Sequence, residues 1–212
     1  MSQVFDFFFG VYKSYPLQDI VLEATAVLFG FLSVWYAKQN KVAVYPTGMI
    51  STSIYVHLLF QWMLLGDMLI NMYYFSMSVY GWYYWTRKDE QQAVPPITIA
   101  TPKEWRIVVA IIAGSLLFVY GVYRFFDRWD TAIANIDTIT TAIFFAGMWL
   151  MARRKIENWI FWIIGDLISI PLYFYKGFTL TSLQYLLFTG IAILGYRSWK
   201  RHINSSSLAA EE

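Results

Sequence analysis

The sequence has no cysteine and only two histidines among its 212 residues. Disulfide bonds and thiolate metal sites are therefore excluded, and two histidines provide few ligands for a zinc site. Charged residues are also scarce, because they make up 14% of the chain and the formal net charge is only +2. The lysines and arginines fall in short connecting segments and form no basic stripe, which argues against nucleic-acid binding.

Motifs of common soluble enzymes are missing as well. The chain contains no GxxxxGK[ST] phosphate loop, no GxSxG nucleophile elbow and no HExxH zinc motif. No pair of acids is spaced for metal binding on one deep helix face. We therefore expect that the protein is not an enzyme and has no catalytic residue, metal site or cofactor.

Apolar and aromatic side chains dominate the composition. Hydrophobic residues make up 58% of the chain and aromatic residues 20%, and the mean hydropathy is +0.45. A helix needs roughly 20 residues to cross a hydrocarbon core about 30 Å thick. Apolar runs of that length predict an all-α integral membrane protein with seven transmembrane helices. The predicted spans are 18–37, 44–64, 67–86, 105–124, 131–152, 157–175 and 178–198.

The remaining segments are shorter or more polar. Residues 1–16 lack the basic start and the cleavage site of a signal peptide, and their phenylalanines favour a short interfacial helix. The proline-containing stretch 86–104 predicts an irregular loop, and residues 200–212 predict a frayed polar tail. With the N-terminus outside, twelve of the sixteen lysines and arginines fall on the opposite side. The positive-inside rule then makes the C-terminus cytoplasmic.

The two ends of the chain resemble each other. A shift of 117 residues places Gly30 on Gly147, and a shift of 114 places Gly81 on Gly195. The difference between the two shifts predicts that the second copy has lost three residues in the turn between its second and third helices. Because four helices separate equivalent elements, both copies point the same way, and a parallel 3+1+3 repeat is a known transporter plan. The predicted parts are the interfacial helix 1–16, a first three-helix bundle 18–86, a loop and linker helix 87–130, a second three-helix bundle 131–199 and a cytoplasmic tail 200–212.

Asp166 is the deepest acid of the sequence. It lies nine residues from either end of the stretch ENWIFWIIGDLISIPLYFY, residues 157–175, and therefore near the middle of the membrane. Trp162, Ser169 and Tyr173 share its helix face at spacings of three and four. An unpaired acid at that depth is costly, which marks the face as a candidate substrate site.

Other spans supply comparable polar side chains. We predict a substrate site where these faces converge, with a small-molecule substrate and the lipid bilayer as partners. The predicted site residues are Gln61, Asn71, Tyr74, Trp82, Asp137, Thr141, Trp162, Asp166, Ser169, Tyr173, Gln184 and Tyr185.

Each of these side chains also has a purely structural interpretation. Serine and threonine in membrane helices commonly bond to their own backbone or to a neighbouring helix. Tryptophans near span ends are typical interfacial anchors, and we expect that role for Trp85, Trp105, Trp129 and Trp199. His57 is either a proton relay or a neutral, hydrogen-bonded side chain.

No lysine or arginine lies deep in the predicted spans to neutralise Asp137 or Asp166. We hypothesise that the ligand supplies the missing positive charge. A flat cation would be held by aromatic faces, at about 0.5 to 2 kcal/mol per cation–π contact, and by the carboxylate. Alternatively, Asp166 is simply protonated in its apolar surroundings.

Two aromatic motifs resemble those of a known family. YGWYYW at Tyr80–Trp85 and ENWIFW at Glu157–Trp162 resemble stretches of the PnuC-type nicotinamide riboside transporters. The 3+1+3 arrangement is similar to that of this family and of the SWEET sugar transporters, and the resemblance extends over residues 18–200. It implies uptake of nicotinamide riboside, an NAD precursor, across a bacterial inner membrane by facilitated diffusion and alternating access. The positions matched by motif are Tyr80, Gly81, Trp82, Trp85, Glu157, Asn158, Trp159 and Trp162.

Two other classes stay open at this point. One is a proton-coupled transporter of a sugar, thiamine or riboflavin, with His57 and Asp137 or Asp166 as the relay. The other is a membrane scaffold or enzyme in which the polar faces only join helices. The oligomeric state is open too, because aromatic outer faces are compatible with a homotrimer or a homodimer.

Overall fold

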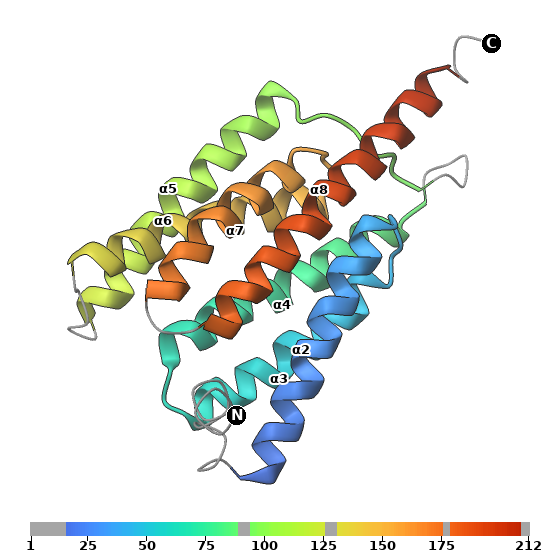
Figure 1. The fold of residues 1–212 in the computed structure, drawn as a ribbon. Coiled ribbons are helices and arrows are strands. Elements are labelled where there is room, and N and C mark those ends of the chain that lie inside the picture. Colours follow the sequence, from blue (N-terminus) through green and yellow to red (C-terminus); the bar gives the residue numbers. More distant parts are fainter. Residues whose placement is uncertain (1–15, 89–93, 126–130, 176–178, 209–212) are drawn as a thin grey trace.

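The computed structural model of the chain is built from helices (Figure 1). It describes residues 16–88, 94–125, 131–175 and 179–208. Apart from Pro16, the interfacial helix predicted for residues 1–16 lies outside this part of the chain. The described residues form seven helices: α2 (Leu17–Lys38), α3 (Val44–Gln61), α4 (Leu65–Thr86), α5 (Pro102–Phe125), α6 (Thr131–Ala152), α7 (Asn158–Tyr175) and α8 (Thr179–Leu208).

Each predicted span coincides with one helix, which confirms the all-helical prediction. The C-terminal ends of two helices, α3 and α8, differ from the predicted spans. The helix α3 ends at Gln61 because Met63 adopts a positive φ of 57° and its amide turns back to the carbonyl of Phe60. The frayed tail predicted from Lys200 is wrong, because α8 continues to Leu208 and Ile203 packs against the hydrophobic core.

The start of α5 is fixed by a capping box. The Thr101 amide donates to the Glu104 carboxylate over 2.9 Å, the Glu104 amide reaches the Thr101 hydroxyl over 3.4 Å, and Pro102 occupies the first helical position. This reciprocal pair satisfies amides that the first turn leaves open. The helix therefore begins three residues earlier than its apolar run predicts.

The helices form two sets of three. Within the first set α3 packs against both α2 and α4, and within the second α7 packs against both α6 and α8. The sets meet through two reciprocal contacts, α2 with α8 and α4 with α6. The helix α5 lies outside, along α6 (Figure 1).

One offset relates the two sets. The helix starts Val44 and Asn158 are 114 residues apart. The shift of 117 predicted for the first two helices therefore differs by three residues from the offset of these helix starts. The glycine matches at 117 were coincidental.

The turns after α2 and α6 share one conformation at the same offset. Asn40 and Arg154 have positive φ angles of 55° and 57°. The Asn40 amide donates to the carbonyl of Ala37 and the Arg154 amide to that of Met151, each over 2.9 Å, in the usual geometry of a helix C-terminus. The two turns also touch, because the Arg154 guanidinium donates to the Asn40 side-chain oxygen over 3.1 Å.

Two tryptophans join the sets by matching hydrogen bonds. The Trp85 indole donates to the carbonyl of Met151 over 3.3 Å, and the Trp199 indole donates to that of Ala37 over 2.9 Å. Their rings lie 5.8 Å apart between centroids. Both donors and both acceptors are 114 residues apart, so each set reaches the other by the same bond.

This packing corrects the role predicted for these tryptophans. Trp85 and Trp199 are 2% and 0% exposed, so the expectation that they are interfacial anchors is wrong. A buried indole needs an acceptor, and the helix-end carbonyls provide it. Trp105 is 40% exposed, as an anchor would be, and Trp129 lies outside the described residues.

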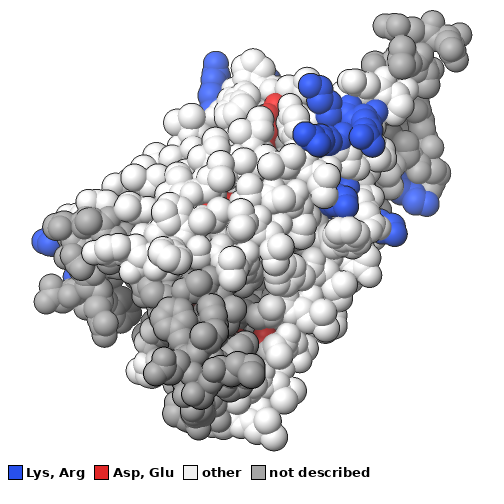
Figure 2. All heavy atoms as spheres, viewed as in Figure 1, with Lys and Arg blue, Asp and Glu red and all other residues white. Residues whose placement is uncertain are grey.

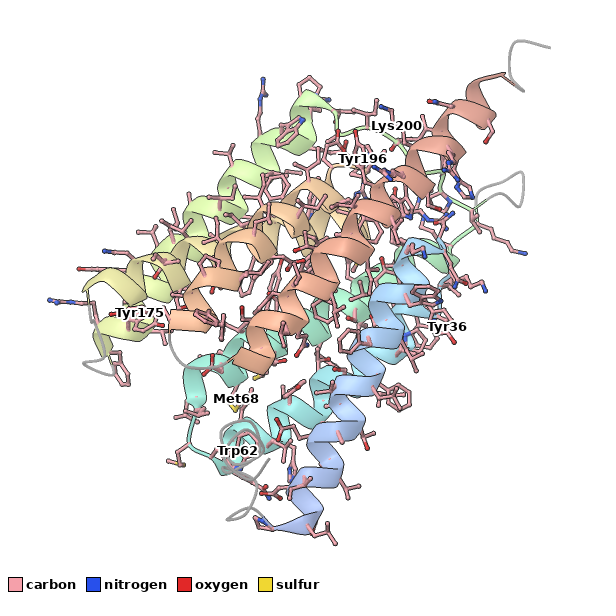
Figure 3. All side chains as sticks on the ribbon, viewed as in Figure 1. Tyr36, Trp62, Met68, Tyr175, Tyr196 and Lys200 are labelled. Carbon is pink, nitrogen blue, oxygen red and sulfur yellow. The ribbon has the colours of Figure 1, made fainter. Side chains whose placement is uncertain are left out.

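The surface is apolar along its length and charged at its ends. Three of the described helices are long and apolar enough to cross a membrane by length and composition: Leu17–Lys38, Pro102–Phe125 and Ala134–Ala152. Lysines and arginines gather where α8 ends, which we call the basic end (Figure 2). Tyr36 and Tyr196 lie toward this end, and Trp62 and Tyr175 toward the other (Figure 3).

Candidate functional site

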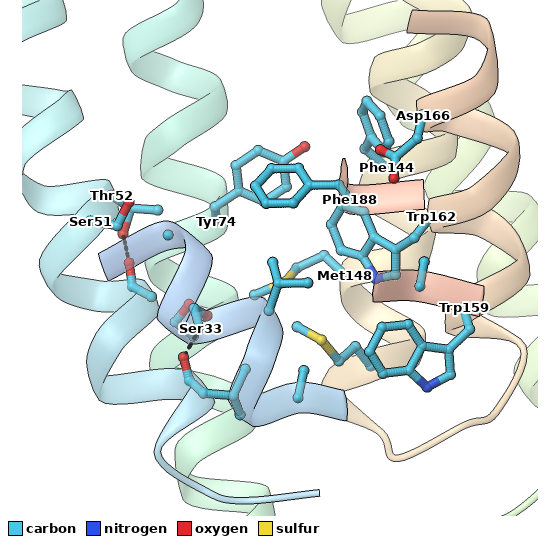
Figure 4. A pocket seen from close by; sticks show the side chains of 18 of the residues that line it. Ser33, Ser51, Thr52, Tyr74, Phe144, Met148, Trp159, Trp162, Asp166 and Phe188 are labelled. Carbon is cyan, nitrogen blue, oxygen red and sulfur yellow. Dashed lines mark hydrogen bonds between the residues drawn. The ribbon is translucent and has the colours of Figure 1, made fainter. Parts of the chain in front are cut away.

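A cavity of about 260 Å³ lies between the two sets of helices (Figure 4). We call it the central cavity. All six helices of the two sets contribute to its lining, which is mostly apolar. The lining residues are Gly30, Ser33, Val34, Ala37, Val44, Gly48, Ser51, Thr52, Tyr74, Ser78, Phe144, Met148, Met151, Trp159, Trp162, Asp166, Tyr185, Phe188 and Ala192.

The second set supplies an aromatic wall. The Phe144 ring stacks on Trp162 with centroids 5.5 Å apart, and lies nearly parallel to Tyr185 at 6.1 Å. Gly165 makes room for this arrangement, because a Cβ there would collide with the Phe144 ring. Stacked rings of this kind present a flat apolar surface to a planar ligand.

The first set supplies small residues instead. Gly30 and Gly48 stand 114 residues before Phe144 and Trp162, and the hydroxyls of Ser51 and Ser33 lie close to these glycines where the second set has rings. The hydroxyl of Ser51 donates to the carbonyl of Ala26 over 2.8 Å. Each such hydroxyl keeps its oxygen lone pairs as acceptors for a ligand.

Asp166 lies in the wall formed by the second set, across the cavity from Ser51 and Thr52 (Figure 4). It is 3% exposed, and none of the described residues forms a hydrogen bond or an ion pair with its carboxyl group. Its electrostatic neighbours are the hydroxyls of Tyr74 and Tyr185. A buried carboxyl group in this state is costly, and a cationic ligand would relieve that cost.

Among the described residues, the lining set contains no lysine, arginine or histidine, so no described basic side chain faces Asp166 across the cavity. Among the described residues, no three histidines or acids come close enough together to hold a metal ion. The arrangement is suited to reversible binding of a flat, positively charged organic molecule.

Four of the predicted site residues line the central cavity: Tyr74, Trp162, Asp166 and Tyr185. Tyr173 lies directly beside them, with its ring 5.2 Å from that of Tyr185. These five side chains come from α4, α7 and α8, so the convergence of polar faces holds for these three helices.

Three other predicted site residues do not line the cavity. Ser169 is buried about one turn further along α7 than Asp166. The Asn71 amide donates to the carbonyl of Asp67 in its own helix over 3.0 Å. Asp137 accepts a hydrogen bond of 3.0 Å from the hydroxyl of Tyr123 in α5.

The remaining predicted residues are not brought to the cavity. Gln61 is exposed at the end of α3, and Trp82 is 45% exposed on the outside of α4. Thr141 and Gln184 are half-buried outside the lining set. His57, the predicted alternative relay, is exposed.

The two family-like motifs close the cavity toward the basic end. Gly81 lies against the Tyr45 ring, where no Cβ would fit. Glu157 accepts a hydrogen bond of 2.8 Å from the Ala100 amide and so ties the loop before α5 to α7. Most of the motif residues therefore hold this end together, while Trp159 and Trp162 reach the lining.

Charged residues brace the same end. The Lys155 ammonium lies 3.0 Å from the Glu104 carboxylate. The Arg154 guanidinium lies 4.3 Å from the Trp85 ring centroid and donates to the carbonyl of Pro95. Burial lowers the pKa of Arg154 from its ordinary value, but arginine stays protonated in proteins.

Sequence reasoning missed several lining residues, notably Phe144, Phe188, Ser33, Ser51 and Thr52. The offset of 114 could have found two of them, because it places Thr52 on Asp166 and Tyr74 on Phe188. The shift of 117 predicted for the first two helices does not pair Thr52 with Asp166.

Comparison with known proteins gives consistent matches. The profile of a family described as "Nicotinamide mononucleotide transporter" matches residues 20–201. The nicotinamide riboside transporter PnuC of Escherichia coli is 26% identical over 208 residues, which cover 87% of this chain and 86% of that protein. The riboflavin/roseoflavin transporter RibM of Streptomyces davaonensis is 28% identical over 131 residues, covering 58% of this chain and 59% of RibM.

A solved structure has a similar fold. The crystal structure of the vitamin B3 transporter PnuC aligns with a TM-score of 0.67 at 22% identity, covering 96% of this chain and 87% of that one. The helical architecture is therefore one already seen in an experimental structure.

Proposed function

The chain belongs to the nicotinamide mononucleotide transporter family, and on that premise we propose that it takes up nicotinamide riboside across a membrane. Several curated relatives carry this activity in their names, and each of those matches spans most of the chain. The family consists of transporters, so the chain is not an enzyme.

One observation carries the proposal: a buried carboxyl group without a countercharge lines a cavity with an aromatic wall. Nicotinamide riboside is a planar pyridinium cation with a carboxamide and a ribose. Its ring would stack on Phe144 and Trp162, and its charge would face Asp166. The ribose hydroxyls would then reach the small polar side, at Ser51 and Thr52.

The cavity favours the riboside over the mononucleotide. A phosphate group needs arginine, lysine or a cluster of amide donors to replace its hydration. The lining residues include no basic side chain, and Asp166 would repel the phosphate. We therefore assign the unphosphorylated nucleoside as the substrate.

Riboflavin is the second candidate, because a riboflavin transporter is among the relatives. Its neutral three-ring system would leave Asp166 without a partner. The cavity of about 260 Å³ is also slightly smaller than the usual range of small-molecule sites, roughly 300 to 1,000 Å³. A proton-coupled mechanism through His57 lacks support, because His57 is exposed and away from the cavity.

We further propose that the architecture is the parallel 3+1+3 repeat of a SWEET-like fold. The common offset of 114, the matching turns at Asn40 and Arg154 and the reciprocal tryptophan bonds support it. All seven helices would cross the membrane, and the sets at 18–86 and 131–199 would rock about the central cavity. The segment 87–130 would link them.

The basic end supports an orientation with a cytoplasmic C-terminus and an external N-terminus in a bacterial cytoplasmic membrane. The closed tryptophan contacts then lie on the cytoplasmic side, and transport would require them to open. A homotrimer or homodimer is compatible with this arrangement, because the outer face of α5 exposes Val109 and Leu117.

The test is uptake of radiolabelled nicotinamide riboside into liposomes that contain only the purified protein. We expect saturable uptake that persists with a protonophore, competition by excess unlabelled riboside, and little competition by the mononucleotide or riboflavin. Absence of saturable uptake would reject the proposed function. Loss of uptake with the protonophore would favour the proton-coupled alternative.

A further inference from the structure

Three polar side chains form a row on the outside of α3. Ser53, His57 and Gln61 follow one another at spacings of four residues, so they share one side of the helix. All three are exposed, and none of them lines the central cavity. None forms a hydrogen bond or an ion pair with another described residue. We call these three residues the polar stripe.

Exposed hydroxyl groups on the neighbouring helix α4 behave differently. The Ser76 hydroxyl donates to the carbonyl of Met72 over 2.8 Å, and the Thr86 hydroxyl donates to that of Trp82 over 2.7 Å. A bond of this kind to the preceding turn satisfies the hydroxyl without any other partner. Ser53 forms no such bond. The polar stripe therefore has hydrogen-bonding groups that no described part of the chain satisfies.

The packing of α3 on α2 gives the depth of the polar stripe. The Ser51 hydroxyl donates to the carbonyl of Ala26, which lies near the middle of α2, a helix long and apolar enough to cross a membrane. At 1.5 Å per residue, Ser53 lies about 3 Å and His57 about 9 Å further along α3 than Ser51. With α3 across the membrane, both lie within the hydrocarbon core, whose half-thickness is about 15 Å. Lipid chains offer these side chains no hydrogen bond.

The equivalent face of the second set is suited to lipid. The offset of 114 pairs the polar stripe with Leu167, Pro171 and Tyr175 of α7. These three side chains are exposed as well. Leucine and proline are apolar, and a tyrosine at the end of a membrane helix is typical of the interface with water. The two sets therefore differ at this face, and only the first set carries groups that lipid cannot satisfy.

We propose that the polar stripe is the contact surface for a second copy of this chain. The inference goes beyond the proposed function and rests on the placement of α3 across the membrane. Copies inserted in the same orientation are related by an axis along the membrane normal, so their stripes meet at the same depth. A hydroxyl, a neutral imidazole and an amide each carry a donor and an acceptor, so each group can bond to its counterpart.

The neighbours of the polar stripe fit such a contact. Ser53 is small, and small residues allow two membrane helices to approach closely. Ile50 and Phe60 lie three residues before Ser53 and three after His57, and are 42% and 60% exposed. These two apolar side chains would pack at the edges of the contact and keep lipid away from its hydrogen bonds.

The first test is disulfide crosslinking in membranes. The chain has no cysteine, so Ser53→Cys supplies a single thiol of similar size on the polar stripe. We expect copper phenanthroline, an oxidant that enters membranes, to convert most of this variant into a covalent dimer. The matched controls are Leu167→Cys at the equivalent position of α7 and Leu117→Cys on α5, which are 53% and 74% exposed in the native protein. Both controls should stay monomeric. Equal crosslinking of all three variants, or no crosslink through Ser53→Cys, would overturn the proposal.

Apolar substitutions distinguish a contact surface from a surface that faces lipid. His57→Leu and Gln61→Leu suit lipid better than the native residues, so a stripe that faces lipid predicts no loss of association. We expect each variant to weaken association about threefold to thirtyfold, as the loss of an interhelical hydrogen bond does. Energy transfer between labelled copies in liposomes, measured as lipid is added, reports the association. Unchanged association in both variants would contradict the proposal.

Residues 1–15 are the other candidate to cover the polar stripe, because they precede α2 and α2 packs against α3. Deletion of residues 2–15 separates the two occupants. Our proposal predicts that Ser53→Cys crosslinks equally with and without this segment. A crosslink that forms only after the deletion would show that the segment covers the stripe, and it would contradict a second copy.

Uptake of nicotinamide riboside by the same variants keeps this inference separate from the proposed function. Retained uptake shows that a variant is folded. Uptake without a crosslink through Ser53→Cys would reject the contact surface and leave the transport function standing. A crosslinked native-like protein that takes up no riboside would reject the transport function and leave the contact surface standing.

Discussion

At the scale of single residues, Asp166 decides the chemistry of the central cavity. The offset of 114 makes Asp166 equivalent to Thr52 in the first set, and both residues line the central cavity. At this pair of positions the second set carries a carboxyl group and the first set carries a hydroxyl group. Asp166 is also the sole acid of the lining set. Under the proposed function, the ligand is therefore selected by this one carboxyl group and by rings that come mostly from the second set.

The substitution Asp166→Asn keeps the shape of the side chain and removes its charge. A hydrogen bond or contact to a charged group contributes about 1.5 to 3 kcal/mol, which corresponds to roughly tenfold to a hundredfold in affinity. We expect titration calorimetry to show a loss of riboside affinity in this range. Unchanged affinity would mean that shape and hydrogen bonding alone hold the ligand.

Glycines of α8 offer a matched pair for stability. A Cβ on Gly195 would lie 2.6 Å from the Trp159 ring, while a Cβ on Gly190 would meet nothing within 4 Å. Gly195→Ala should therefore lower the free energy of unfolding by about 1 to 3 kcal/mol. Gly190→Ala should be neutral or slightly stabilising, because alanine is the better helix former. Thermal unfolding in detergent distinguishes the two, and equal midpoints would contradict the packing at Gly195.

The site could be predicted from the sequence only in part, for a physical reason. Helical spacing places Trp162, Asp166 and Tyr173 on one face, and that face points inward. The same spacing gives no sign that Trp82 points outward, because its helix is aromatic on several sides. Ser51 and Thr52 were missed since hydroxyls in membrane helices commonly bond to backbone, as these two do.

At the scale of elements, the two sets are held by their helix ends. Trp85 and Trp199 each donate to a carbonyl in the last turn of a helix in the other set. The turn at Arg154 adds a contact with its equivalent turn at Asn40. These contacts are all on the basic side, so they act as one latch.

Replacing either tryptophan by phenylalanine removes one hydrogen bond and keeps most of the ring. If the latch closes the cytoplasmic side, Trp85→Phe and Trp199→Phe should each expose the central cavity from that side. The chain has no cysteine, so Ser78→Cys in the lining gives a single reporter without background. An impermeant thiol reagent is added on the cytoplasmic side. We expect it to label the cysteine of Ser78→Cys several times faster in either tryptophan variant than in the protein that keeps Trp85 and Trp199. Equal labelling rates would contradict the latch.

Helix positions were more predictable than helix ends. The apolar runs located every described helix because a bilayer imposes a common length on crossing segments. The end of α8 was missed because its last turns are polar, although Ile203 returns to the core. The start of α5 could have been predicted from the sequence, because Thr101, Pro102 and Glu104 match the pattern of a capping box.

At the scale of the whole molecule, two sets of three helices build an asymmetric cavity. The sequence indicates the proposed repeat through Gly81, Gly195, Trp85 and Trp199, which take part in close packing at the offset of 114. The lining could not be found in this way, because equivalent positions there carry different residues: Gly48 corresponds to Trp162, and Thr52 corresponds to Asp166. Divergence at these positions is what allows a repeat to bind a ligand with two different ends.

The proposed orientation has its own test. Single cysteines at Leu17→Cys and Lys103→Cys mark opposite ends of the molecule, and both positions are exposed. In intact cells an impermeant thiol reagent should label the first and spare the second. The reverse pattern would contradict a cytoplasmic basic end.

The central claim is that the cavity between the two sets holds a pyridinium nucleoside. An experimental structure of the protein with nicotinamide riboside bound tests it most directly. The account predicts the ring against Phe144 and Trp162, its positive nitrogen facing Asp166, and the ribose toward Ser51. A riboside bound only at a lipid-facing groove, or a central cavity that stays empty at saturating riboside, would contradict it.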